Sequence, residues 1–327
     1  MLKTFVSELA AASLFCCALP PAGAATIQED FTTDPATRGW SAAGDAALFH
    51  WDATNQDLAV TWDSSQTNSF FYLPLHTALT RDDDFRLQFD LRLQDIAIGT
   101  TPGKDSTFEI ALGLVNLAQA TGPGYLRGTG TDSPNLVEWD YFPDSGFGAT
   151  VSAVMISTTN VWAASFNSPV ALSPDTTYHF DLNYSAATQT MQVAMNDGTT
   201  TLPLQPAVIT DPFGDFAVDS LAVSSYSDTG QDPMFAGSVL AHGTVDNLVL
   251  DLPTPPIRRY VGALTNGVWT AQFTGWTGWR YTLEVSTDLQ RWTPVGAAFD
   301  STGGRQTISD LQPAANRAFY RLRADKL

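Results

Sequence analysis

The sequence has little positive charge and few charged residues of any kind. Only 16 of its 327 residues are Lys or Arg, against 34 Asp or Glu, which gives a net charge of −18. Charged residues make up 15% of the chain and hydrophobic residues 44%, a composition that excludes a disordered or fibrous protein. Because a strongly negative surface repels phosphate backbones and anionic membranes, we expect no nucleic-acid partner.

Cysteine is almost absent, and both cysteines lie near the N-terminus. Cys16 and Cys17 lie within an apolar run at residues 5–19, which precedes a small-x-small cleavage pattern. This arrangement predicts a signal peptide over residues 1–24 and a mature chain that starts at Ala25, in a secreted or cell-surface protein. The run is too short to span a bilayer, and the absence of a later run of about 20 apolar residues predicts no transmembrane segment. The mature chain would have no disulfide and no thiolate metal site.

Charge is unevenly distributed along the chain. Residues 25–257 carry six Lys or Arg and 28 Asp or Glu, whereas residues 258–327 carry nine and five. The change falls at residues 253–257, where three prolines stiffen the chain as a linker. We therefore predict a large domain over residues 25–252 and a small one over residues 258–327.

The large domain alternates apolar and polar residues with a period of two. Residues 85–93 alternate without a break, residues 108–114 repeat the pattern, and residues 178–184 are predicted to form a hairpin with residues 191–195. No mature segment shows a sustained helical period. This pattern predicts an all-β fold, a two-sheet antiparallel jelly-roll sandwich followed by a second, small β-sandwich domain.

Histidine is scarce and does not form zinc-binding spacings. The chain has 4 His, none two or four residues from another. His179 lies on the polar face of its predicted strand, where we expect a cross-strand surface pair.

The first and last strands of the large domain carry a family resemblance. Residues 28–31 read Gln-Glu-Asp-Phe, and residues 243–250 end in Val-Asp-Asn-Leu-Val-Leu. They resemble the paired terminal strands of the concanavalin A-like lectin/glucanase superfamily and of LamG-like jelly rolls. The resemblance covers residues 25–252 and implies that the two strands lie side by side in one sheet.

The strand at residues 136–144 carries the strongest signal for chemistry. Glu138 and Asp140 point to the same face about 7 Å apart, and burying either carboxylate unpaired is costly. Two such side chains need a cation, a shared proton or open solvent. Ca²⁺ is a suitable cation because it accepts hard oxygen ligands in flexible sets.

This strand is similar to the metal-binding segment of legume-type lectins. The resemblance implies that Asp140, the carbonyl of Phe142 and Asp144 are calcium ligands and that Glu138 contributes to a second metal site. The further Asp and His of the lectin pattern are absent here.

The same strand also resembles the catalytic strand of jelly-roll glucanases, with Glu138 and Asp140 in the first two of three acidic positions. A retaining mechanism needs two carboxyl groups about 5–5.5 Å apart, and the expected second Glu is missing. We therefore assign no catalytic residue.

Two further groups complete the predicted sites. In jelly-roll binding modules, an Asp of the closing strand joins acids of the opening strand around a structural Ca²⁺, which implies a site at Asp246 with Glu29 or Asp30. The Gly- and Pro-rich run at residues 121–130 places Tyr125 and Arg127 at the rim of the sandwich, where long loops commonly bind ligands. The predicted ligand-binding set is Glu138, Trp139, Tyr125 and Arg127.

The C-terminal domain contains four of the nine tryptophans. Its residues 281–292, together with residues 319–323, resemble a small β-sandwich module found at the C-termini of large secreted bacterial proteins. The resemblance implies an accessory or surface-retention role.

Taken together, these features predict a secreted or surface-attached glycan-binding protein, non-catalytic and stabilised by Ca²⁺, with exposed Trp and Tyr side chains stacking on sugar rings. Two alternatives stay open: a glycoside hydrolase or lyase that uses Glu138 with Asp140 or Asp144, and a structural or adhesive surface protein.

Overall fold

The computed structural model describes residues 26–127, 133–232, 236–252, 257–275, 279–313 and 318–326. The predicted signal peptide and residues 253–256 of the predicted linker lie outside the described residues. Within the described ranges, no helix is long and apolar enough to cross a membrane.

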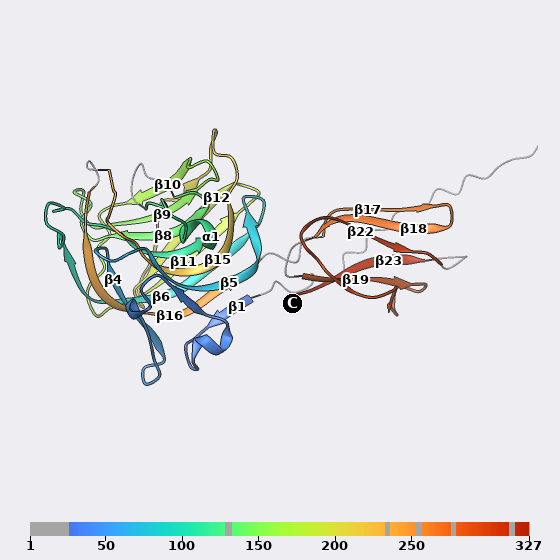
Figure 1. Ribbon diagram of the computed structural model, residues 1–327, viewed down its shortest axis with the longest axis horizontal. Coiled ribbons are helices and arrows are strands. Elements are labelled where there is room, and N and C mark those ends of the chain that lie inside the picture. Colours follow the sequence, from blue (N-terminus) through green and yellow to red (C-terminus); the bar gives the residue numbers. More distant parts are fainter. Residues whose placement is uncertain are drawn as a thin grey trace, which may run out of the picture.

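The larger unit is built from two facing sheets of antiparallel strands (Figure 1). The first described sheet has nine strands: β13 (Thr201–Pro203), β12 (Thr190–Asn196), β11 (Thr177–Ser185), β6 (Phe85–Ile98), β16 (Val239–Asp251), β4 (Asp57–Asp63) and β3 (Phe49–Asp52) in that order, with β1 (Thr26–Glu29) paired to β16 and β14 (Ala207–Val208) paired to β12. The second has seven: β10 (Trp162–Asn167), β9 (Thr150–Ile156), β8 (Leu136–Phe142), β7 (Ile110–Val115), β15 (Ala217–Ser225), β5 (Ser69–Thr80) and β2 (Ser41–Ala43). The described part of this unit also includes the short helices η1 (Pro35–Arg38), η2 (Ala46–Leu48) and α1 (Leu117–Ala120). The predicted all-β sandwich is confirmed.

The nine-stranded sheet follows the alternation of the sequence. The alternating apolar positions of β6 from Phe85 to Leu93 are buried, and the residues between them lie half-buried or exposed on the outer face. The hairpin between β11 and β12 pairs Ser185 with Thr190. The terminal strands lie side by side as the resemblance implies, with Glu29 of β1 opposite Leu248 of β16.

The seven-stranded sheet differs from the expectation of one apolar and one polar face per strand. Every residue of β7 and β9 is buried, and so are the first six of β8. One face packs on the other sheet, where the Trp139 ring lies 5.5 Å from that of Phe89 and 4.5 Å from that of Phe180. The opposite face contacts Tyr125 and Arg127 of the loop after α1, which are themselves buried. Covering by this loop explains why polar residues of these strands are buried.

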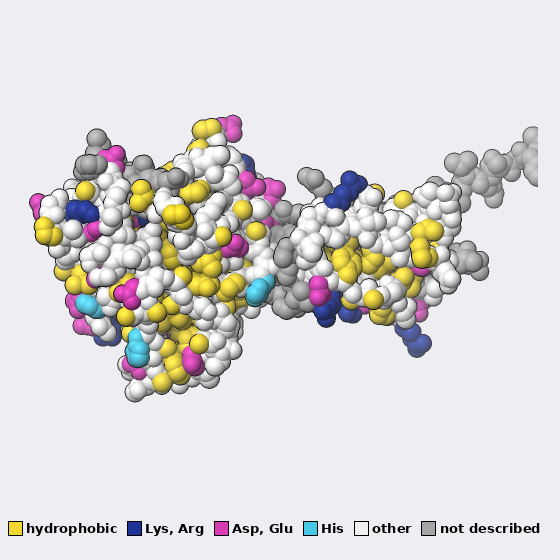
Figure 2. All heavy atoms as spheres, viewed as in Figure 1, with side chains coloured by type: hydrophobic (Ala, Val, Ile, Leu, Met, Phe, Trp, Pro, Cys, Tyr) yellow, Lys and Arg dark blue, Asp and Glu magenta, His cyan; other side chains and the backbone are white. Residues whose placement is uncertain are grey.

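The second unit contains two smaller sheets. One has β17 (Arg258–Thr265), β18 (Val268–Gly275) and β22 (Gly304–Asp310), and the other has β20 (Thr293–Pro294), β19 (Trp279–Ser286), β21 (Phe299–Asp300) and β23 (Phe319–Lys326). Trp269 of the first sheet stacks on Tyr320 of the second at 3.8 Å, and Phe273 contacts Tyr281 at 4.9 Å. Figure 2 shows the difference in charge between the units, with Lys and Arg prominent on the smaller one and Asp and Glu on the larger one.

Candidate functional site

A sealed charge cluster on the seven-stranded sheet

Glu138 and Asp140 lie on the face of β8 that points away from Trp139 and from the sandwich core. Both are 0% exposed. Gly113 of β7 lies opposite Glu138, and a Cβ atom at this glycine would stand 2.6 Å from the Cα of Glu138. Only glycine therefore fits beside Glu138 without a shift of the strand.

The cation that these two carboxylates require is the guanidinium of Arg127. Its Nη2 lies 2.7 Å from Oδ2 of Asp140, and its Nε lies 3.3 Å from Oε2 of Glu138. A third carboxylate, Glu109, has its Oε2 3.5 Å from Nη1 of Arg127. The Arg127 side chain is 2% exposed and that of Glu109 1%. These residues, with Tyr226, form the sealed cluster.

Tyr226 ties the cluster to β15 and its following loop. Its hydroxyl donates a 2.7 Å hydrogen bond to Oε1 of Glu138, and its ring lies 5.8 Å from Cζ of Arg127. Tyr125 stacks on Tyr226 with the ring centres 6.3 Å apart. A cation above an aromatic face is stabilised by the ring quadrupole. Aromatic rings thus close the cluster on the side away from the strands.

The sealed cluster contains three carboxyl groups for one guanidinium, and burial raises the pKa of each of the three acids. Burial raises the pKa of Glu109 to about 8, against the opposing charge of Arg127. Burial and the charge of Asp140 raise the pKa of Glu138, and burial also raises that of Asp140. Both carboxyl oxygens of Glu109 lack a hydrogen-bond partner among the described residues. A protonated Glu109 at neutral pH relieves part of the buried negative charge.

All four predicted ligand-binding residues are buried, so the expectation of an exposed aromatic platform here is wrong. Trp139 is 0% exposed because it fills the core, and Tyr125 is 6% exposed because it packs on Tyr226. Arg127 and Glu138 bind each other. The assignment of these residues to a ligand stays a prediction, and it requires Arg127 to leave the cluster.

The predicted metal ligands on β8 do not converge. Asp140 is held by Arg127, whereas Oδ1 of Asp144 accepts a 3.0 Å hydrogen bond from the backbone of Gly146. Phe142 ends β8, half-buried. Among the described residues, no group of three or more His, Cys, Asp or Glu side chains has the geometry to hold a metal ion.

The three acids of the second predicted metal site also take separate partners. Glu29 is buried and accepts a 2.9 Å hydrogen bond from Nε of Arg38, and Asp30 accepts from the Thr32 hydroxyl at 2.8 Å. Asp246 lies on β16 in a different setting, described next. Calcium binding stays a prediction.

An open polar pocket on the nine-stranded sheet

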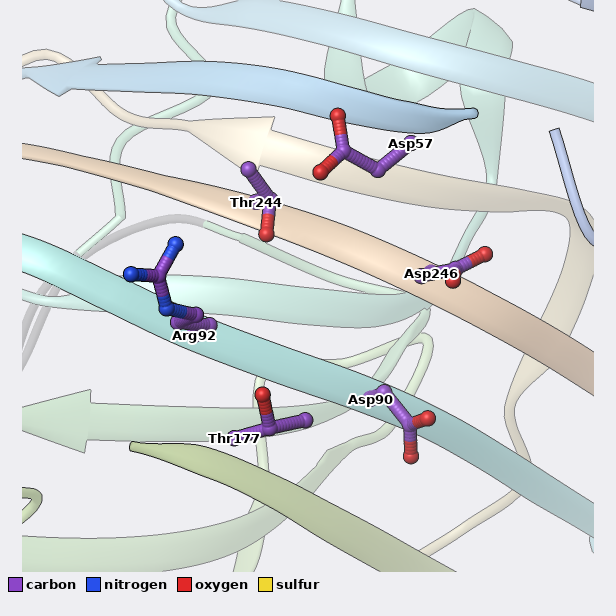
Figure 3. Close-up of a pocket in the computed structure, with 6 residues that line it drawn as sticks. All are labelled: Asp57, Asp90, Arg92, Thr177, Thr244 and Asp246. Atoms are coloured by element: carbon purple, nitrogen blue, oxygen red, sulfur yellow. The ribbon is translucent and has the colours of Figure 1, made fainter. Parts of the chain in front are cut away.

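An open hollow of about 160 Å³ lies on the outer face of the nine-stranded sheet (Figure 3). We call it the open pocket; its lining residues are Asp57, Asp90, Arg92, Thr177, Thr244 and Asp246. They come from four neighbouring strands, β4, β16, β6 and β11. None was in the predicted site except Asp246.

The strand register places these side chains in two rows across the sheet. Asp246 lies opposite Asp90, and Asp90 lies opposite His179. Extending the β4–β16 register by one residue from the Leu58–Val245 pair sets Asp57 opposite Asp246. Two residues along the strands, Arg92 lies between Thr244 and Thr177, facing one on each side. The pocket is therefore a product of register rather than of any local motif.

A β-bulge shapes the pocket at Asp246. The β6–β16 ladder shifts register between Asp246 and Val249, and Asn247 between them has a φ of 50°. A bulge bends its strand and re-aims neighbouring side chains. The side-chain amide of Asn247 donates to Oδ2 of Asp90 at 2.8 Å and to Oδ2 of Asp246 at 3.2 Å.

The lining groups differ in how their charge is compensated. Nδ1 of His179 lies 2.7 Å from Oδ1 of Asp90, which confirms the expected cross-strand pair. Nη2 of Arg92 lies 2.6 Å from Oδ1 of Asp175. Burial and the charges of Asp90 and Asp57 raise the pKa of Asp246 to about 6, against a backbone hydrogen bond from Asn247. Asp246 thus lies beside like charges.

Sequence reasoning missed Glu109, Tyr226 and most of the open pocket. Glu109 interrupts an apolar run between Phe108 and Ile110, so an alternation analysis could have placed it on the face of β7 that neighbours Glu138. Asp90 and Arg92 occupy regular polar positions of β6, which look like any solvated strand face. No sequence signal singles them out.

Comparison with known proteins

No protein-family model matches the chain, and no curated protein sequence matches it. Solved structures similar to this chain include three lectin-type domains. The first is the carbohydrate recognition domain of Emp47p, with 10% identity, a TM-score of 0.41 and coverage of 70% of this chain and 95% of that one. The second is a legume lectin-like domain from Entamoeba histolytica, with 11% identity, a TM-score of 0.41 and coverage of 68% and 95%. The third is peanut lectin with a bound peptide, with 15% identity, a TM-score of 0.39 and coverage of 71% and 100%.

At such identities and TM-scores the likeness carries no inference about function. The proposals below rest on the geometry of this chain.

Proposed function

We propose that this chain is a secreted or surface-attached glycan-binding protein and that it binds sugar in the open pocket of the nine-stranded sheet. The observation that carries the proposal is the lining, which consists of polar side chains from four adjacent strands around one hollow. Sugar hydroxyls need several convergent donors and acceptors, which carboxylates, a guanidinium and threonine hydroxyls supply. Secretion rests on the N-terminal sequence pattern.

The dimensions and the setting of the pocket support recognition of one sugar unit. Its volume of about 160 Å³ is below the roughly 300–1,000 Å³ typical of pockets for drug-sized ligands. The lining residues lie on strands, so their positions are fixed before a ligand binds and little ordering entropy is lost. The lining contains no aromatic side chain, and hydrogen bonding therefore replaces stacking as the source of affinity.

The alternative of a hydrolase or lyase needs Glu138 and Asp140 in contact with a polysaccharide. In the structure both are wholly buried beneath Arg127 and Tyr226. The alternative of a structural or adhesive protein predicts indifference to sugars, so the same binding assay separates it from the proposal.

The test is a glycan array probed with the full chain and two variants. Thr244→Phe places a large side chain in the lining of the pocket, because Thr244 points outward from β16. Asn183→Phe places the same side chain on the outer face of β11, where Asn183 is exposed and pairs with Arg86 outside the pocket. We expect binding by the wild type and by Asn183→Phe, and loss in Thr244→Phe. Absence of binding to every glycan, with folded protein, would refute the proposal.

A further inference from the structure

We propose that the sugar bound in the open pocket is an amino sugar, whose ammonium group lies between Asp57 and Asp246. This inference rests on the glycan-binding function proposed above and names the chemical class of its ligand. It follows from the charges of the lining, from the partners those charges already have, and from the hydroxyl groups beside them.

The open pocket contains a row of carboxylates on adjacent strands. Asp246 lies directly opposite Asp90 across the β6–β16 ladder, and the register sets Asp57 opposite Asp246 on the other side. Like charges directly opposite each other destabilise a sheet. A ligand cation placed in this row would convert that repulsion into attraction.

The basic side chains beside this row, Arg92 and His179, already have partners in the protein. Arg92 pairs with Asp175, and its Nε also donates to the Asp175 carbonyl at 3.3 Å. His179 is held by Asp90. Thr244 hydrogen-bonds Asp57, and no described Lys, Arg or His forms an ion pair with Asp57 or Asp246. Asp57 and Asp246 therefore face the open pocket without an ion pair among the described residues, and the cationic charge that acts on Asp57 is that of Arg92, whose own ion pair is with Asp175.

The lining of the open pocket suits an ammonium group better than a metal ion. Ca²⁺ takes six to eight oxygen ligands, and among the described residues no group of three or more His, Cys, Asp or Glu side chains could hold a metal ion. An ammonium group needs only two or three acceptors in hydrogen-bond reach. Thr177, Thr244 and Arg92 then lie on the same face to bind the hydroxyls that surround an amine in a sugar ring, which a lysine side chain lacks.

The experiment measures binding of the full chain by calorimetry at about pH 6.5 and low salt. The probes are a glucosamine tetrasaccharide, its N-acetylated counterpart, and tetralysine. Because a hydrogen bond to a charged group contributes more than a neutral one, we expect the glucosamine oligomer to bind about tenfold tighter than the acetylated one.

Two variants locate the effect. Asp246→Asn should remove the preference for the charged sugar, and Asp57→Asn should reduce it in the same way. Asp105→Asn is the matched control, because Asp105 is exposed in the loop after β6, outside the lining. It should keep the full preference. Retention of the preference in both pocket variants would overturn the proposed position of the ammonium group.

Three other outcomes would also overturn the inference. Equal affinity for the two oligosaccharides would leave the proposed glycan binding intact, but it would refute the proposal that the ligand carries an ammonium group. Tetralysine binding as tightly as the glucosamine oligomer would show that a basic peptide is the ligand. Absence of binding to either sugar, together with a blank glycan array, would refute the proposed function itself.

Discussion

The outer faces of the two sheets carry the same set of charges in two different settings. The sealed cluster combines three carboxyl groups with Arg127, and the open pocket combines Asp57, Asp90 and Asp246 with Arg92. In the cluster the arginine lies among the acids, whereas Arg92 pairs with Asp175 instead. Carboxyl groups and an arginine thus form a buried charge cluster on one sheet and line an open pocket on the other.

The two outer faces differ because side chains cover one of them and water covers the other. Tyr125, Arg127 and Tyr226 close over the carboxylates of β8, and a buried carboxylate needs a cation or a proton of its own. The open pocket remains in contact with water, so its carboxylates are only partly desolvated. A face that is open to water can therefore keep like charges together for a ligand.

Replacing the arginine on each sheet should have very different effects on stability. Arg127→Met leaves three buried carboxyl groups without a cation and should lower the free energy of unfolding by about 3–5 kcal/mol. Arg92→Met is the matched variant; its side chain is 40% exposed, and loss of a surface ion pair should cost less than about 1 kcal/mol. Urea unfolding at pH 7 measures both. Equal losses would contradict the difference in burial.

The second prediction concerns the dependence of stability on pH. The pKa of Glu109 rises from 4.5 to about 8 on folding. Between these values the folded protein holds a proton that the unfolded chain releases, so the free energy of unfolding should fall as the pH rises. Glu138 and Asp140 shift in the same direction. We expect Glu109→Gln to reduce this slope in urea unfolding series run from pH 5 to 9.

Asp246→Asn is the control for that series. The pKa of Asp246 rises from 3.8 to about 6, so its contribution has the same sign and is confined to a lower window of pH. Removing Asp246 should leave the slope between pH 7 and 9 unchanged. An unchanged slope in Glu109→Gln would show that this carboxyl group does not hold the proton.

Sequence reasoning succeeded where a local pattern decides the structure. Alternation assigned the buried face of β6, and the i, i+2 spacing placed Glu138 and Asp140 on one face. That this pair needs a cation, a shared proton or open solvent was also apparent, and the structure supplies a cation. That the cation is Arg127 follows from the path of the loop after α1, which depends on contacts distant in the sequence.

The open pocket could not be predicted for a related reason. Its residues lie far apart in the chain, and only the register of four strands brings Asp57, Asp90 and Asp246 into one row. The bulge at Asn247 contributes to that register, and a bulge of this kind has no clear signature in one sequence. A shift of one residue would have turned these side chains toward the core.

Neutralising Asp246 should change the stability of the protein only slightly. Asp246→Asn removes one charge from a row of like charges, while the new amide oxygen can still accept the hydrogen bond from the backbone of Asn247. The free energy of unfolding at pH 7 should therefore rise, by about 0.2–1 kcal/mol. Asp105→Asn, on an exposed loop, should leave it unchanged within experimental error. Urea unfolding of the two variants against the wild type measures the difference, and a loss of stability in Asp246→Asn would show that its charge is compensated within the protein.

A gain in stability combined with loss of sugar binding would mean that Asp246 destabilises the free protein and acts in recognition. Arg127 on the opposite sheet, in contrast, acts in folding.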